Sequence, residues 1–284
     1  MTETLFAFHT VQKGESIPSE LMEDLLHERI TGILIKDFLS QEEVVSVRNG
    51  FKNIPDEMKT RVNDGFVSYP LSFAQFTQMK GAGIMSIEDY LSIADEVLKD
   101  QQQRFGLNFV DRLSRFLESS ESFRKVEPIF NSAAGKPMVP FNFRELFPGN
   151  GELIVHCENL FFEEFPDFFN WLKLMDIVDN KLSYFITLQE AEDGGELCCF
   201  DLNWNTVKHR ENPTHVVDVD HNEIDIDNRN VARQLIRPNE GDLLLFAGGN
   251  VWHRVEKVRG SKSRITLGGF IAETTEPGKY YIWS

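Results

Sequence analysis

The segment ELIVHCENLFF, residues 152–162, places His156 and Glu158 two positions apart in an apolar stretch that is typical of a β-strand. Successive strand residues point to opposite faces, so these two polar side chains are expected to share one space. An imidazole and a carboxylate together are the beginning of a metal site, because both are metal ligands. Taken alone, the pair also fits a structural hydrogen bond, so the metal hypothesis needs a third ligand.

The third ligand is predicted to be His253. It follows PNEGDLLLFAGGNVW, in which a turn, an apolar strand and a Gly-Gly bend lead into a new strand. The other histidines precede the β-rich half of the chain or lie in the polar stretch 201–233. Two imidazoles and one carboxylate form a facial triad, which holds Fe(II) and leaves three adjacent coordination positions open.

A second set of residues begins at Arg264, eleven positions after His253, in the strand pattern RITLGGFI. Arg264, Thr266 and Gly268 share one face of that strand. An arginine beside a metal can bind a carboxylate through two parallel hydrogen bonds, and the threonine hydroxyl can add a third. The glycine would leave room for a bound molecule. The residues therefore predict a metal and a carboxylate-bearing co-substrate in a pocket lined by strands.

The elements that position these residues follow from the hydrophobic pattern. Residues 32–51 predict a strand and then a helix, with Ser40 and Glu43 forming a capping box. Apolar spacing across 86–130 predicts two or three helices that support a sheet. From about residue 137, short β-rich runs separated by turns such as EDGG and PNEGD favour a sandwich, a barrel or a jelly roll.

Composition limits the classes of partner. The 284 residues can form one large domain, and the simplest prediction is a single α+β domain. A net charge of −16 weighs against nucleic acid and anionic membranes as partners. No apolar run is long enough to span a bilayer, and the N-terminus lacks the pattern of a secretory signal. Three cysteines give no disulfide framework and predict a cytoplasmic location.

The segments HCE (156–158), EDGGELCCFD (192–201) and PNEGDLLLFAGGNVWHRVEKVRGSKSRITLGGFI (238–271) resemble the core of the Fe(II)/2-oxoglutarate-dependent dioxygenases, in the branch similar to prolyl hydroxylases. The resemblance implies a double-stranded β-helix, or jelly-roll, core with supporting N-terminal helices. The predicted single dioxygenase domain, 1–284, divides into an N-terminal strand and helices (1–136), the core (137–272) with an insertion at about 201–237, and a C-terminal tail (273–284).

The resemblance implies that His156, Glu158 and His253 are the iron ligands. Aspartate is commoner than glutamate at the middle position, and a spacing of 97 positions from one histidine to the other is long for this branch. Arg264 matches the residue that pairs with the distal carboxylate of 2-oxoglutarate, and Thr266 matches the hydroxyl beside it. Further candidates are Thr187 for the co-substrate, at a position where relatives often have tyrosine, and Asn159, Trp252 and Trp283 for the substrate.

The implied reaction is hydroxylation of an unactivated C–H bond with release of succinate and CO₂, using Fe(II), 2-oxoglutarate and O₂. We expect a small-molecule substrate, a free amino acid, because the layout also resembles the free-amino-acid hydroxylases and halogenases. Halogenases have lost the metal carboxylate, since chloride occupies its position, so Glu158 favours hydroxylation. The alternatives are a prolyl- or aspartyl-type hydroxylase of proteins or peptides, a halogenase, and a non-catalytic jelly-roll binding module.

Overall fold

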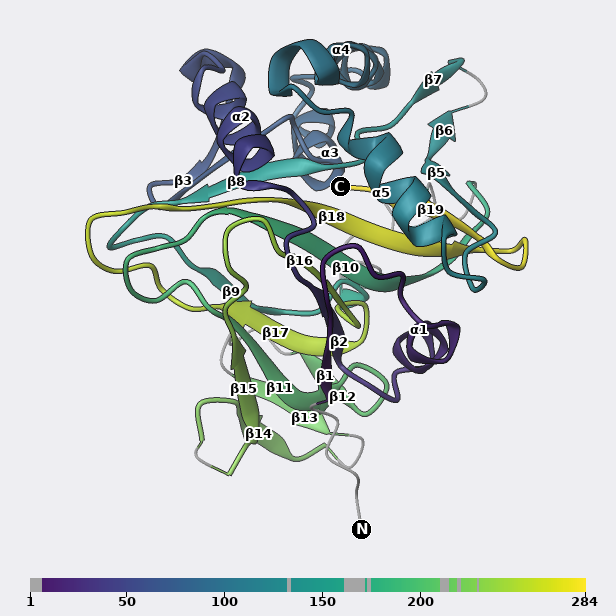
Figure 1. Ribbon diagram of the computed structural model, residues 1–284. Helices are drawn as coiled ribbons and strands as arrows, with labels where there is room; N and C mark the ends of the chain where they lie inside the picture. Colours follow the sequence, from purple (N-terminus) through teal and green to yellow (C-terminus); the bar gives the residue numbers. More distant parts are fainter. Residues whose placement is uncertain are drawn as a thin grey trace.

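The structure is a computed structural model in which two β-sheets lie one above the other and helices cover the outer face of the larger sheet (Figure 1). The described residues are 7–131, 134–160, 172, 175–209, 215–218, 221–228 and 230–284. Among these residues, no helix is both long and apolar enough to cross a membrane. The aromatic segment 161–171, which follows His156 and Glu158 in the sequence, lies outside them.

The larger sheet has ten strands in the order β1-β2-β16-β10-β18-β8-β4-β3, with β19 paired to β18 and β5 paired to β19. Adjacent strands are antiparallel except for the pairs β1–β2 and β5–β19. The strands are β1 (Phe8–Val11), β2 (Gly32–Ile35), β3 (Thr60–Asn63), β4 (Phe66–Tyr69), β5 (Lys125–Pro128), β8 (Asn142–Leu146), β10 (Ile177–Gln189), β16 (Leu243–Phe246), β18 (Arg264–Thr274) and β19 (Lys279–Trp283).

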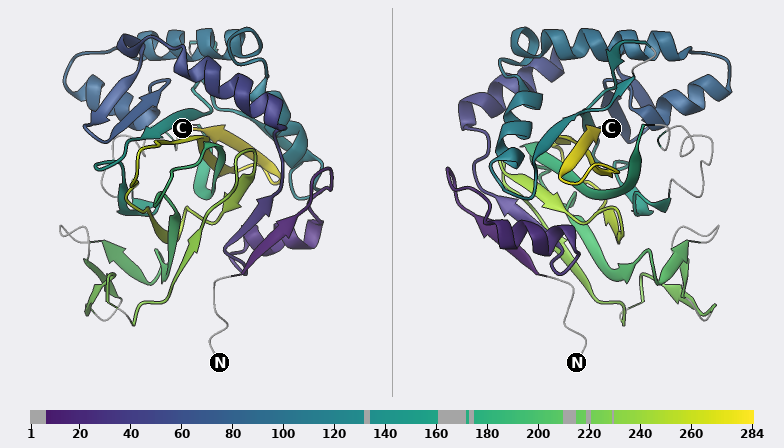
Figure 2. Two further views of the ribbon diagram at one scale, coloured as in Figure 1. Left: turned by 60° about the vertical axis from the view of Figure 1, so that its left-hand side comes forward. Right: turned by 90° about the vertical axis from the view of Figure 1, so that its right-hand side faces the viewer.

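The N-terminal region contributes more to this sheet than the sequence predicted. Strands β1 to β5 all come from the first 136 residues, for which one strand and supporting helices were expected. The region therefore extends the sheet on both sides. Figure 2 shows β1 and β2 along one side of the molecule, below the layer of helices.

The smaller sheet has four antiparallel strands in the order β15-β11-β17-β9. They are β9 (Leu153–His156), β11 (Leu197–Asn203), β15 (Arg233–Ile236) and β17 (Val251–Val255). Within the predicted insertion at about 201–237, the part between β11 and β15 carries a three-stranded sheet at the end of the molecule farthest from the layer of helices, whereas both ends of that range belong to strands of the smaller sheet (Figure 2). The strands of the three-stranded sheet are β12 (Val207–His209), β13 (His215–Asp218) and β14 (Glu223–Asp225), and a separate short pair is β6 (Phe130–Asn131) with β7 (Lys136–Pro137).

The helices begin where the sequence provides caps. Ser40 Oγ accepts from the Glu43 backbone N–H at 3.2 Å and Glu43 accepts from the Ser40 N–H at 2.8 Å, which confirms the predicted capping box. Two helices lie within 86–130, where two or three were predicted. The helices are α1 (Ser19–Leu26), α2 (Gln41–Lys52), α3 (Phe73–Gly81), α4 (Ile87–Phe105) and α5 (Phe109–Glu118), with a 3₁₀ turn at Asp56–Met58.

Aromatic side chains fill the space between the helices and the larger sheet. Phe51 of α2 stacks on Phe143 of β8 with ring centroids 5.0 Å apart. Phe105 and Phe109 extend this contact from α4 and α5. Each buried ring of this size stabilises the fold by roughly 1.5–3 kcal/mol. The helices thus hold the outer face of the sheet rigid, which leaves the inner face free for chemistry.

Strand β10 crosses the centre of the larger sheet, and its side chains alternate between the outer face, which packs against the helices, and the inner face, which carries the site. Tyr184 points to the outer face, where its hydroxyl donates to the Pro140 carbonyl at 2.7 Å and its ring packs near Phe109. By strand alternation, Ser183, Phe185 and Thr187 point to the inner face, toward the smaller sheet. The inner face therefore carries the polar residues that the sequence singled out.

Candidate metal centre and cofactor pocket

His156 and His253 lie directly opposite each other on the adjacent strands β9 and β17. Their ring centroids are 4.4 Å apart, and the rings are inclined by 54°. The Phe246 ring meets the His253 ring edge to face at 4.9 Å. The two imidazoles, 97 positions apart in the sequence, are thus held together by strand register.

Both histidines are oriented in the same way by the backbone of their own strand. His156 Nδ1 donates to the Ile154 carbonyl at 2.7 Å, and His253 Nδ1 donates to the Val251 carbonyl at 2.8 Å. A carbonyl only accepts hydrogen bonds, so Nδ1 carries the proton in each ring. Nε2 of each ring therefore keeps its lone pair, as a metal ligand requires.

Glu158 is held beside the histidines by the Gly-Gly bend between β16 and β17. The backbone N–H of Glu158 donates to the Gly248 carbonyl, and that of Asn159 donates to the Gly249 carbonyl, both at 3.1 Å. A Cβ at position 248 would lie 2.8 Å from Glu158 Oε2 and 2.1 Å from Ser183 Oγ. Glycine is therefore required at position 248 for the carboxylate to occupy this place.

Only one of the two oxygens of the Glu158 carboxylate accepts a hydrogen bond from a described residue. Ser183 Oγ donates to Oε1 at 2.6 Å, and His253 Nε2 lies 3.5 Å from the same oxygen. Oε2 is buried and has no hydrogen-bond partner among the described residues. A buried carboxylate oxygen left in this state is costly unless a cation or another donor satisfies it.

Donor atoms of His156, Glu158 and His253 all lie within 4.8 Å of one another. Burial lowers the pKa of His156 to about 4, and burial together with the neighbouring His156 lowers the pKa of His253 well below its ordinary value. Both imidazoles are therefore neutral at physiological pH, as metal binding requires. Burial raises the pKa of Glu158 to about 8, and a cation at this point would reverse that shift. The donor set and the unpartnered oxygen fit Fe(II).

Arg264 begins β18 on the inner face, where it is 7% exposed. Its guanidinium lies 5.0 Å from the centre of the Phe185 ring and has no ion pair or hydrogen bond with any described residue. Burial lowers its pKa to about 10, and the nearby Arg144 adds to that effect. A buried arginine in this condition is suited to an anionic ligand.

The two threonines predicted to accompany Arg264 face each other across the sheet. Thr187 of β10 pairs with Thr266 of β18, and each is 3% exposed. Thr187 and Arg264 also line a common small cavity beside Gly194 and Gly195. The sequence suggested that Gly268 leaves room for a bound molecule. The structure gives another reason for glycine at this position, because a Cβ there would lie 2.3 Å from the Tyr184 carbonyl oxygen. Glycine at 268 permits the close approach of β10.

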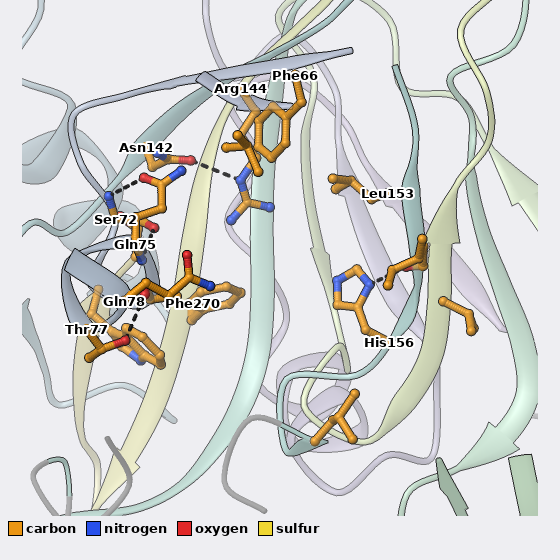
Figure 3. Close-up of a pocket in the computed structure, with 17 residues that line it drawn as sticks. Phe66, Ser72, Gln75, Thr77, Gln78, Asn142, Arg144, Leu153, His156 and Phe270 are labelled. Atoms are coloured by element: carbon orange, nitrogen blue, oxygen red, sulfur yellow. Dashed lines mark hydrogen bonds between the residues drawn. The ribbon is translucent and has the colours of Figure 1, made fainter. Parts of the chain in front are cut away.

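A cavity of about 330 Å³ opens beside the metal candidate (Figure 3). Arg144 and His156 project into it from opposite sides, with Gln75 and Gln78 of α3 along one edge. A smaller inner cavity of about 40 Å³ contains the three metal candidates, Arg264 and Thr266. Arg144 lines both cavities.

The candidates for substrate contact are placed differently from one another. Trp283 lines the outer cavity. Asn159 is not among the residues that line the two cavities, and its Nδ2 donates to Asn250 Oδ1 at 2.8 Å. Trp252 is fully buried, packs against Trp204 and donates its Nε1–H to the Val207 carbonyl at 3.1 Å. Of the three residues predicted to contact the substrate, the structure therefore places Trp283 at the outer cavity and the other two away from it.

Sequence reasoning missed Arg144, Ser183 and the role of Gly248. Arg144 lies in FNFREL, where alternation gives Asn142 and Arg144 one face of a strand. That alternation was a usable signal for Arg144. Nothing in the local sequence distinguishes Ser183, since its function depends on contact with Glu158.

Comparisons with known proteins agree with this geometry. A family model described as carrier-protein-independent halogenase WelO5 matches residues 8–284. A crystal structure of an N-substituted L-amino acid dioxygenase from Burkholderia ambifaria AMMD, in complex with alpha-KG, has a TM-score of 0.55 and 14% identity and covers 94% of this chain and 91% of that chain. A second structure described as this dioxygenase, also from Burkholderia ambifaria AMMD, has a TM-score of 0.54 and 14% identity and covers 95% and 92%. The search of curated proteins gave no match.

The solved structures show a shared fold, and the family match extends over nearly the whole chain. The enzyme uses Fe(II), 2-oxoglutarate and O₂, in keeping with the His-Glu-His group. The chain belongs to the WelO5 family and is an Fe(II)- and 2-oxoglutarate-dependent oxygenase.

Proposed function

We propose that this enzyme hydroxylates an unactivated C–H bond of a small molecule, a free amino acid, and releases succinate and CO₂. In this proposal His156, Glu158 and His253 hold Fe(II), which supplies the oxidising chemistry once 2-oxoglutarate and O₂ are bound. The protein orients the ligands through the two Nδ1 hydrogen bonds and the Ser183 contact. The Nδ1 contacts orient the two imidazoles, and the Ser183 contact orients the carboxylate.

The co-substrate end of the site is proposed to be Arg264 with Thr266 and Thr187. The unpaired guanidinium offers two parallel N–H donors to the distal carboxylate of 2-oxoglutarate, and the threonine hydroxyls can add hydrogen bonds. The mutual pairing of the two threonines and their shared burial with Arg264 support this assignment.

The observation that carries hydroxylation over halogenation is Glu158. This residue is 2% exposed, one of its carboxylate oxygens is buried without a hydrogen-bond partner among the described residues, and its donor atom lies within 4.8 Å of those of His156 and His253. A halide needs a coordination position that a metal carboxylate would otherwise fill, and here a carboxylate fills it. Although the family is described as one of halogenases, this feature supports oxygen insertion.

The order of strands supports a double-stranded β-helix core in a single dioxygenase domain. Between β8 and β18 the chain passes alternately through the larger and the smaller sheet, with β11 and β15 of the smaller sheet following each other. The cavity volume of about 330 Å³ supports a small molecule rather than a protein segment.

The test is succinate release with Fe(II), 2-oxoglutarate and O₂ across a panel of free amino acids and short peptides, in buffer with and without chloride. The expected result is succinate formation that a free amino acid stimulates, with a product that has gained one oxygen atom. A product in which chlorine replaces hydrogen would contradict the proposal, and so would stimulation by peptides alone.

Matched variants test the ligand assignment. His156→Ala and Glu158→Gly remove one metal ligand each, whereas Glu158→Asp keeps a carboxylate. The first two are expected to abolish substrate-stimulated succinate, and the third to retain part of it. Succinate formation that is unchanged in His156→Ala would exclude the proposed iron site.

A further inference from the structure

Two arginines lie on the inner face of the larger sheet without a carboxylate partner among the described residues. Arg144 of β8 is paired with Thr266 of β18, and Arg264 lies two positions before Thr266 on the same strand. Strand alternation therefore places both guanidiniums on one face. The distal carboxylate of 2-oxoglutarate is the proposed partner of Arg264, so the presence of Arg144 on this face needs a separate explanation.

Arg144 is held in position by a chain of hydrogen bonds. Asn142 Nδ2 donates to the Pro70 carbonyl at 3.0 Å, which fixes the amide, and Asn142 Oδ1 accepts from Arg144 Nε at 3.0 Å. The guanidinium lies 5.7 Å from the centre of the Phe270 ring. Its two terminal nitrogens make no hydrogen bond with a described residue, and Figure 3 shows them directed into the cavity. The guanidinium is therefore held in one orientation, with its two terminal nitrogens placed to bind both oxygens of a carboxylate.

The position of Arg144 separates it from Arg264. Arg144 lines both the inner cavity and the outer cavity of about 330 Å³, whereas Arg264 lines the inner cavity and is absent from the lining of the outer one. Among the described side chains that line the outer cavity, Arg144 is the only permanently charged one. A molecule that enters through this cavity would meet Arg144 immediately before the metal candidate.

We propose that Arg144 binds the carboxylate of the substrate, so that the enzyme selects carboxylic acids and oxidises a carbon a short distance from the acid group. This inference rests on the proposed function, because it names the substrate class of the same site. Arg144 is a substrate-binding residue in this scheme, and Asn142 is a positioning residue that acts through it.

The first experiment needs no substrate. Anaerobic enzyme with Fe(II) is titrated with 2-oxoglutarate, and the visible charge-transfer band reports binding. Arg264→Gln is expected to weaken 2-oxoglutarate binding about 10²-fold, because a charge-assisted pair is lost. Arg144→Gln is expected to leave 2-oxoglutarate affinity unchanged. An equal loss in Arg144→Gln would assign Arg144 to the co-substrate and overturn the proposal.

The second experiment compares each amino acid of the panel with its carboxamide, by the change in the charge-transfer band and by stimulated succinate release. The acids are expected to act and the amides to fail. Arg144→Gln should raise the KM for the most active acid about 10²-fold, with partial rescue in Arg144→Lys. Arg61→Gln, which removes an exposed arginine of β3, is the matched control and should match wild type.

Asn142→Asp provides an independent check at nearly constant shape. It gives Arg144 an internal carboxylate partner, so binding of the acid should weaken although Arg144 is intact. An amide that acts as well as its acid in wild type, no response to any acid, or an unchanged KM in Arg144→Gln would each overturn the inference. Absence of the charge-transfer band and of succinate in wild type would instead refute the proposed function.

Discussion

Ser183 of β10 donates its hydroxyl to Glu158 Oε1 at 2.6 Å, and the same oxygen lies 3.5 Å from His253 Nε2, whereas Oε2 is buried without a hydrogen-bond partner among the described residues. One strand of the larger sheet thus orients a donor that follows a strand of the smaller sheet. The contact orients the carboxylate, and several predictions about the site depend on it or on its neighbours.

Removal of this hydroxyl should weaken metal binding. Ser183→Ala frees the carboxylate to rotate, and loss of a partner that orients a ligand typically lowers metal affinity about 10- to 100-fold. Titration of metal-free enzyme with Mn²⁺ or Fe(II) measures the effect. Ser119→Ala, at an exposed helix end, is the control, and equal affinities in the two variants would show that Ser183 does not orient the ligand.

Gly248→Ala should damage both the fold and the metal site. Its Cβ would lie 2.1 Å from Ser183 Oγ, and relief of that overlap should cost roughly 1–3 kcal/mol of unfolding free energy. Gly81→Ala is the matched control, since no atom lies within 4 Å of a Cβ there. Urea denaturation and metal titration should show a loss only in Gly248→Ala. Normal values in that variant would mean that the bend can move away.

Adjacent residues of β10 should have separable functions. Tyr184→Phe removes a buried donor to the Pro140 carbonyl, so it should lower the unfolding free energy by about 1–3 kcal/mol and leave 2-oxoglutarate affinity unchanged. Thr187→Val, on the opposite face, should weaken 2-oxoglutarate binding. The charge-transfer titration and urea denaturation together distinguish the two. Weaker 2-oxoglutarate binding in Tyr184→Phe would contradict the assignment of faces.

The metal-free enzyme should lose stability as the pH rises from about 7 to 8. The pKa of Glu158 is raised from 4.5 to about 8, so the folded protein retains a proton that the unfolded chain has released. The stability that this proton provides is complete below pH 4.5 and is lost as the pH rises through 8, at no more than about 1.4 kcal/mol per pH unit.

The histidines oppose this slope only weakly above about pH 7. Their pKa values are lowered in the folded state, so they are neutral there, and in the unfolded chain their ordinary pKa of 6.5 leaves them mostly neutral at these pH values. Urea denaturation of metal-free wild type and Glu158→Gln at a series of pH values tests the prediction. The slope should be absent in Glu158→Gln, and parallel curves for the two proteins would refute it.

The sequence was most informative where spacing alone determines direction. HCE and the strand from Arg264 could be interpreted because alternation fixes which side chains share a face, and the structure brings the three proposed ligands together. The capping box of α2 followed from a local hydrogen-bond pattern. Features of this kind need no knowledge of distant segments.

The rest depended on contacts between segments that are far apart in the chain. Asn159 is adjacent to a proposed ligand, but the chain leaves β9 before it, and its amide bonds with Asn250. Trp252 precedes His253 by one residue and therefore points away from it into a separate apolar cluster. Arg144 was overlooked because an arginine on an alternating strand is ordinary until the opposite wall of the cavity is known.

The direct pairing of His156 with His253 couples assembly to catalysis. If β9 slipped by a single residue along β17, the imidazole at 156 would turn to the other side of the smaller sheet, and no change of rotamer could return it. A bound ion would therefore link the two strands, and its binding would stabilise only the correct register. Iron uptake should then be a late reporter of folding, since only chains that have aligned this pair possess a centre to fill.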